Sequence, residues 1–185
     1  RTAQFLAKMV RSLSAHPDWD MIYANQDIIG PDGRLLKDSC HYAGYQEPKG
    51  SGHVYLPEDP SELNTVANNY IGAAFLYRRR VACLLGDYSK NRFTTEDYDY
   101  WMLVNELLSL HHADFAEPVY EYRFHEDSLT ARDEELGITR GRDRLMVFDD
   151  FRRDFFLAPI AWTVVCDGSA PALPESLRAR IGSSG

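Results

Sequence analysis

The chain has 185 residues, of which 44% are hydrophobic and 26% are charged, a composition typical of an ordered globular domain. Its formal net charge of −8 argues against a nonspecific nucleic-acid binder, which needs a basic surface to neutralise phosphates. No segment reaches the roughly 20 apolar residues of a membrane-spanning helix. Three widely spaced cysteines, Cys40, Cys83 and Cys166, indicate neither a disulfide framework nor a zinc site and favour the cytoplasm.

The first third of the chain alternates predicted helix and strand. Hydrophobic spacing predicts a helix over residues 2–15 that ends before Pro17, because the residue before a proline disfavours the α region. A strand is expected at 21–24, followed by two extended arms around a Pro-Asp-Gly turn over 28–36. Residues 38–60 read as a long surface excursion, and connections of that length are often functional or mobile.

The same alternation continues to the end of the chain. The predicted elements are a buried strand over 70–77, a helix over 78–85 ended by Gly86, a helix over 96–110, strands over 114–116 and 119–125, a helix over 133–156, a strand over 160–168 and a helix beginning at 175. This order predicts an α/β layered domain with a mixed sheet flanked by helices. We divide it into residues 1–132, a helical extension over 133–158, and a strand-turn-helix tail over 159–185 whose assignment stays open.

One acidic and aromatic segment, RFTTEDYDYW at residues 92–101, supports two interpretations. In the first, Thr94 or Thr95 caps a helix and the carboxylates complement its dipole, which local pattern alone favours. In the second, Asp97 and Trp101 share one helix face because they are four residues apart. A carboxylate beside an aromatic ring suits a polyhydroxylated ligand.

A second candidate is the strand over residues 120–125. Its alternation places Tyr120, Tyr122 and Phe124 on one face and Glu121, Arg123 and His125 on the other. Residues two apart on a strand lie roughly 6.5 to 7 Å apart, so a guanidinium and an imidazole together can meet a phosphate or a metal-bound diphosphate. The alternative is an edge strand with a solvated polar face.

Two further patterns are interpreted structurally. Asp18-Trp19-Asp20 matches the D-x-D pattern of metal-binding sugar-nucleotide enzymes, but it follows a predicted helix end, so we interpret it as a turn. His111-His112 falls at a predicted helix C-terminus, where such residues are favourable without being ligands.

In this order, the motifs resemble the C-terminal half of a family 2 glycosyltransferase with the GT-A fold, over about residues 1–132. The resemblance rests on His16-Pro17-Asp18, Met21 to Ala24 with the following hairpin, Asn69 to Ala74 leading to Tyr77-Arg78-Arg79, Glu96 to Trp101 as the family's E-D-x-D-x-W, and Arg123-x-His125-x-x-Ser128 as its R-x-H-x-x-S.

The resemblance implies an inverting transfer from a nucleotide-sugar donor to a saccharide or other hydroxyl acceptor. Asp97 would be the general base that removes the acceptor proton. Substrate contacts would come from Glu96, Trp101, Gly72, Ala73 and Arg123, and His125 would approach a divalent cation, Mg²⁺ or Mn²⁺, at the leaving diphosphate.

The sequence also departs from the family pattern. The nucleotide-binding strand and its D-x-D have no counterpart before Arg1, so we expect this chain alone to be inactive and an upstream segment or a partner chain to supply the donor half. Leu103 stands where many members carry arginine, and the absence of Q-x-x-R-W argues against processive polysaccharide synthases. The main alternative is a noncatalytic carbohydrate- or partner-binding module. A hydrolase would need two carboxylates roughly 5 to 10 Å apart across a bond.

Overall fold

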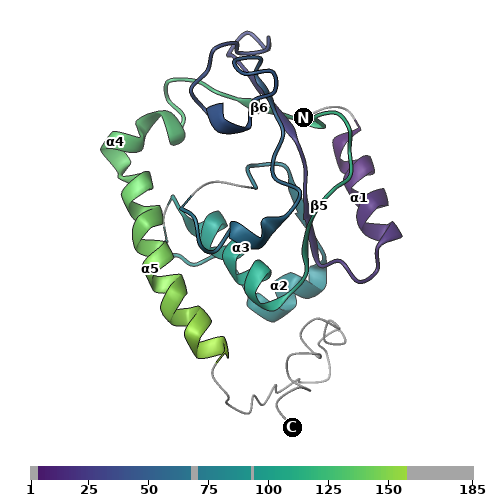
Figure 1. The fold of residues 1–185 in the computed structure, drawn as a ribbon, viewed down its shortest axis with the longest axis vertical. Coiled ribbons are helices and arrows are strands. Elements are labelled where there is room, and N and C mark those ends of the chain that lie inside the picture. The colour runs from purple at the N-terminus through teal and green to yellow at the C-terminus, as the bar shows by residue number, and fades with distance from the viewer. Residues whose placement is uncertain (1–3, 68–70, 93, 158–185) are drawn as a thin grey trace.

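The computed structural model describes residues 4–67, 71–92 and 94–157, which form an α/β fold (Figure 1). Within these residues the helices are α1 (Phe5–Ala15), α2 (Arg79–Leu85), α3 (Glu96–Leu107), α4 (Asp133–Leu136) and α5 (Ile138–Leu157). The strands are β1 (Met21–Tyr23), β2 (Gln26–Ile29), β3 (His53–Val54), β4 (Phe75–Tyr77), β5 (Leu110–His112) and β6 (Tyr120–Arg123). Short 3₁₀ turns occupy Ala43–Tyr45, Pro60–Glu62 and Thr130–Arg132.

The described strands form two small mixed sheets, where we expected one. The first has the order β4-β1-β5 and the second the order β3-β2-β6. In each sheet the central strand pairs antiparallel with one neighbour and parallel with the other. Because β1 and β2 are separated only by Ala24 and Asn25, the central strands of the two sheets follow each other almost directly.

Helices cover both faces of the first sheet. On β1, Ile22 packs in a core cluster with Phe5, Met9 and Leu13 of α1, whereas its neighbours Met21 and Tyr23 belong to the larger cluster that contains α3. This division follows the alternation of side chains along a strand. In Figure 1, α1 and α3 accordingly lie on opposite sides of these strands.

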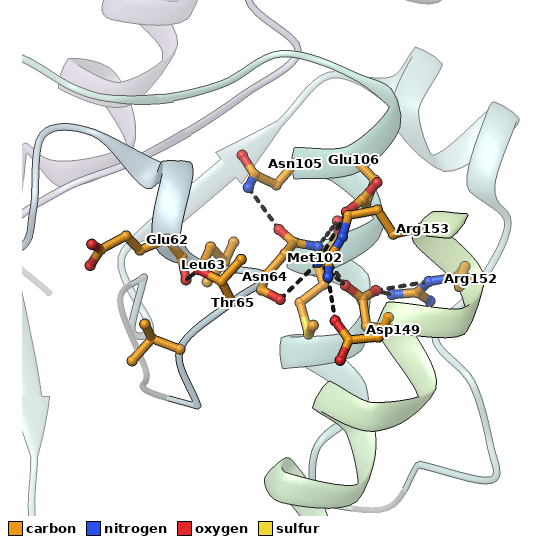
Figure 2. Close-up of polar contacts among 12 residues, drawn as sticks. Glu62, Leu63, Asn64, Thr65, Met102, Asn105, Glu106, Asp149, Arg152 and Arg153 are labelled. Carbon is orange, nitrogen blue, oxygen red and sulfur yellow. Dashed lines mark hydrogen bonds and ion pairs between the residues drawn. The ribbon is translucent and has the colours of Figure 1, made fainter. Parts of the chain in front are cut away.

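A buried polar network fixes α5 against α3 and the loop before residue 68 (Figure 2). Arg152 Nη1 donates to Asp99 Oδ1 at 2.8 Å, and Arg152 Nε donates to Asp149 Oδ1 at 2.9 Å. The fully buried Asp149 also accepts a hydrogen bond of 2.9 Å from Asn64 Nδ2. Leu145 of α5 joins the same core cluster as Trp101 of α3. The helix predicted after residue 132 therefore shares the core of the preceding residues.

The local predictions hold for several elements. The helix over 2–15, the strand over 21–24 and the helix ended by Gly86 are confirmed within the described residues. The arms over 28–36 close as expected, since Gly30 N donates to Arg34 O at 2.8 Å. The predicted strand over 160–168 and the helix beginning at 175 lie outside the described residues.

Two predictions between residues 108 and 116 are wrong. The helix α3 ends at Leu107, and the strand is formed by residues 110–112, not by 114–116. His111 and His112 therefore lie in β5, not at a helix end. The physical reason is that residues 110–112 pair with β1. The N–H groups of Asp20 and Met21 also donate to Ser109 O, both at 3.1 Å, so the chain is extended here and α3 does not continue.

The helix predicted over 133–156 is divided into α4 and α5 at Gly137, which has a positive φ of 66°. Glycine adopts this left-handed conformation without the steric cost that other residues incur. Among the helices of the described residues, none has the length and apolar character needed to span a bilayer.

Candidate functional site

A pocket of about 520 Å³ opens at the N-terminal end of α3. Four parts of the chain line it: the loop around residues 40–42, residues 94–101, the end of β6 with the turn that follows, and the α4–α5 region. The pocket therefore collects side chains that lie up to about a hundred positions apart in the sequence.

The first turn of α3 supplies the residues that the sequence singled out. Glu96, Asp97 and Trp101 all line the pocket. Asp97 and Trp101 face it together because they are one helical turn apart. The Trp101 side chain is buried, and its ring meets the Phe75 ring edge-on at 5.5 Å between centroids. The sequence-based interpretation of this segment as a carboxylate beside an aromatic ring agrees with the geometry.

Threonine capping of α3, the interpretation that local pattern favoured, is not observed. The N-cap residue is Thr95, but its side chain makes no capping hydrogen bond. Asp97 takes part of this role, because its Oδ1 accepts the N–H of Tyr98 at 2.7 Å. The same carboxylate therefore lines the pocket and is held in place by the helix that carries it.

Burial raises the pKa of Asp97, and the neighbouring Glu96 raises it further. The Tyr98 N–H and the Arg142 guanidinium act in the opposite direction, and burial outweighs them. A carboxylate with a raised pKa is a stronger proton acceptor than an ordinary surface aspartate. Asp97 is thus suited to general base catalysis.

The third acid of the segment has a structural role. Asp99 accepts a hydrogen bond from Arg152 and lies 3.9 Å from Arg92 Nε. Its carboxylate is largely buried between these two cations. Asp99 therefore holds α5, and of the three acids in this segment only Glu96 and Asp97 line the pocket.

Sequence reasoning missed several polar residues of the pocket, among them His41 and Arg142. Burial and the nearby Arg142 lower the pKa of His41 to about 4, so its imidazole is neutral at pH 7. The His41 ring stacks on Tyr122 of β6 at 5.0 Å between centroids. The one available signal for His41 was the length of the 38–60 excursion, and nothing in the local pattern marked Arg142.

Gly72 and Ala73 lie behind the pocket and do not line it. Gly72 is buried with φ of 63°, and a Cβ there would come within 2.9 Å of Gln26 Oε1 and 3.0 Å of the Tyr42 hydroxyl. Ala73 N donates to Gln26 Oε1 at 3.4 Å. Since Tyr42 lines the pocket, the close packing at Gly72 supports its wall. The preceding Asn69 and Tyr70 lie outside the described residues.

Arg123 and His125 do not share this pocket with Asp97. The predicted alternation places Phe124 in the pocket and Tyr122 against His41, so Arg123 and His125 take the other face. Arg123 Nη1 donates to the carbonyls of Gly30 and Pro31, both at 2.8 Å, and His125 is exposed. Their substrate and metal roles stay predictions.

The described residues do not by themselves fit a resident divalent cation. Among residues 4–67, 71–92 and 94–157, no group of three or more His, Cys, Asp or Glu side chains is arranged to hold a metal ion. Asp20 of the Asp18-Trp19-Asp20 pattern is fully buried, pairs with Arg80 Nε at 2.6 Å and accepts the Ser109 N–H at 3.0 Å. This geometry supports its interpretation as a structural turn.

Comparison with known proteins does not assign the chain. No protein-family model matches it, and no curated protein matches it.

Proposed function

We propose that this chain forms the acceptor side of an inverting glycosyltransferase, with Asp97 as the general base. The observation that carries the proposal is the convergence of Glu96, Asp97 and Trp101 on one pocket of about 520 Å³. Pockets of roughly 300 to 1,000 Å³ suit small ligands. The resemblance of residues 92–101 to the E-D-x-D-x-W helix start gives the reaction class.

The proposed reaction requires a proton acceptor beside a bound hydroxyl. The acceptor oxygen attacks the anomeric carbon of the nucleotide-sugar, the new C–O bond forms, and the bond to the diphosphate breaks with its electron pair. Asp97 takes the proton of the attacking hydroxyl, which raises the nucleophilicity of the oxygen. Its anchoring by the Tyr98 N–H restricts the carboxylate to one orientation.

We assign binding of the nucleotide-sugar donor to another part of the intact enzyme. The described residues offer no set of ligands for a cation at the diphosphate, so the proposed Mg²⁺ or Mn²⁺ and the nucleotide would be bound by an upstream segment or a partner chain. Trp101 and Phe124 both line the pocket, and the half-buried Phe124 offers aromatic surface against which the apolar face of a sugar packs favourably.

The proposal is tested by Asp97→Asn in the intact enzyme. Loss of the base should lower the transfer rate by about 10²- to 10⁴-fold, while nucleotide-sugar binding stays within about twofold. Asp143→Asn, an exposed change on α5, is the matched control and should leave both unchanged. Retained transfer, or loss of donor binding, in Asp97→Asn would contradict the assignment of the base.

A noncatalytic carbohydrate-binding module is the second candidate. It is favoured by the buried polar atoms of the pocket that lack partners, because a saccharide would satisfy them whether or not transfer follows. This candidate predicts saccharide binding with no transfer to any acceptor in the intact protein, and no dependence of binding on the Asp97 charge.

A further inference from the structure

Four of the pocket residues carry a buried polar atom without a hydrogen-bond partner. They are His41 Nε2, Glu96 Oε2, Trp101 Nε1 and Arg142 Nε. Among the described residues only six side-chain atoms are of this kind, so most of them gather around one pocket. Since buried polar groups are nearly always paired, this concentration indicates a ligand that supplies the missing partners.

The four atoms require a ligand that both donates and accepts. Trp101 Nε1 and Arg142 Nε are donors only, and the Glu96 carboxylate is an acceptor. A neutral imidazole, as at His41, donates or accepts according to its tautomer. A hydroxyl group also does both, so neighbouring hydroxyls on one ring match this set.

The charges of the pocket disfavour an ionic ligand of either sign. An anion would approach the Arg142 guanidinium but would meet the carboxylates of Glu96, Asp97 and Asp133 in the same pocket. A cation would be attracted by these acids, but it would be repelled by Arg142 and could not accept a hydrogen bond from the unpartnered Trp101 Nε1 and Arg142 Nε. None of the described ion pairs includes Arg142, whose Nη2 donates a long hydrogen bond of 3.4 Å to Thr139 Oγ1. The guanidinium is therefore available to a neutral oxygen.

We propose that the pocket binds a neutral saccharide through neighbouring hydroxyls held by Glu96, His41 and Arg142, and that His41 and Arg142 determine which saccharide is accepted. Calling this saccharide the acceptor rests on the proposed function; its binding does not. His41 lies in the 38–60 excursion and Arg142 lies in α5, so neither belongs to the motifs that carry the family resemblance. The apolar face of the saccharide packs against the half-buried Phe124, and the buried Trp101 contributes its indole N–H.

Binding is measured by calorimetry and by ¹⁵N-detected titration of the 185-residue chain, with no donor present. The probes are glucose, galactose, N-acetylglucosamine and their β-linked disaccharides, with glucuronate, tetramethylammonium and inorganic phosphate as charged probes. We expect at least one neutral probe to bind and to shift the Trp101 indole N–H signal. Binding by charged probes alone, or by none of the probes, would overturn the proposal.

Substitutions connect this binding to the named atoms. Arg142→Met should weaken the affinity for the neutral probe at least tenfold, whereas Arg140→Met, an exposed change two positions earlier on α5, should leave it unchanged. Glu96→Gln keeps the side-chain size and should also weaken binding, which provides a second test if Arg142→Met does not fold. Equal affinity in the wild type and Glu96→Gln would contradict the assignment.

The two proposals fail separately. Saccharide binding that persists while Asp97→Asn leaves transfer intact would contradict the base assignment and support the binding site. Conversely, transfer that depends on Asp97 but uses a non-saccharide hydroxyl, with no neutral saccharide bound, would contradict the binding site and leave the base in place.

Discussion

At the scale of single residues, His41 couples the stability of the fold to pH. Burial and the Arg142 charge lower its pKa from 6.5 to about 4. Between these two values the unfolded chain binds a proton at this position and the folded chain does not, so lowering the pH favours unfolding. At about 1.4 kcal/mol per pKa unit, the loss between pH 7 and pH 4 should be about 2 to 3 kcal/mol.

This prediction is checked by urea unfolding of the wild type and His41→Gln from pH 7.5 to pH 4. The variant should lose less stability over this range, because it has no imidazole to protonate. The raised pKa of Asp97 acts in the opposite direction, since the folded state then binds the Asp97 proton more tightly. Burial also lowers the pKa of His111 and His112. These pKa shifts are present in both proteins, so the difference between the two pH profiles of stability reports on His41 alone. Parallel profiles would contradict the prediction.

At the scale of elements, the ion pairs of Arg152 decide whether α5 stays against α3. Arg152→Met removes the nearest cation from two buried carboxylates, Asp99 and Asp149, and leaves only the more distant Arg92, at 3.9 Å from Asp99, and Arg153, at 3.6 Å from Asp149. Removing one member of a buried ion pair typically costs about 3 to 5 kcal/mol. Because the remaining cations compensate part of the charge, we expect the free energy of unfolding to fall by about 3 kcal/mol in urea denaturation.

The matched control for Arg152→Met is Arg132→Met. Arg132 pairs with Glu135 on the surface, where ion pairs contribute little because water screens both charges. This change should leave the unfolding midpoint nearly unaltered. Similar midpoints for the two variants would show that the network of Figure 2 does not hold α5.

The local sequence pattern correctly predicted the elements whose ends and buried faces depend on residues close together in the sequence. The spacing of Phe5, Met9 and Leu13 defines one face of α1, and Gly86 ends α2 at the expected position. The strand β5 was missed because residues 110–112 are extended through their pairing with β1, and such pairing is not encoded in a local window. The division into two sheets has the same origin.

The same distinction explains the candidate site. Asp97 and Trp101 were predictable as neighbours because helical periodicity places them on one face. The alternation in β6 was also correct, but only the parallel pairing of β6 with β2 decides that Phe124, and not His125, reaches the pocket. His41 and Arg142 meet there through contacts between segments that are distant in sequence, and no periodicity records such contacts.

At the scale of the whole molecule, Asn25 joins the two sheets. Its Oδ1 accepts the Leu56 N–H at 2.9 Å and lies 2.9 Å from His112 Nε2 of β5, while its backbone carbonyl accepts the Val119 N–H next to β6. One buried side chain at the junction of β1 and β2 thus bonds to segments on either side. The two sheets should therefore unfold as one unit.

Asn25→Leu tests this coupling, because leucine has similar size and cannot hydrogen-bond. The change leaves the buried Leu56 N–H and the half-buried His112 ring nitrogen without partners, and an orphaned buried group costs about 1 to 3 kcal/mol. Native-state hydrogen exchange should report equal losses of protection at Ala24 N–H, which bonds Ala74 O next to β4 of the first sheet, and at Ile28 N–H, which bonds Gly52 O beside the second. A loss confined to one of these amides would mean that the sheets open independently, and the pocket, which takes Phe124 from beyond β6 and Trp101 from α3, would then open without global unfolding.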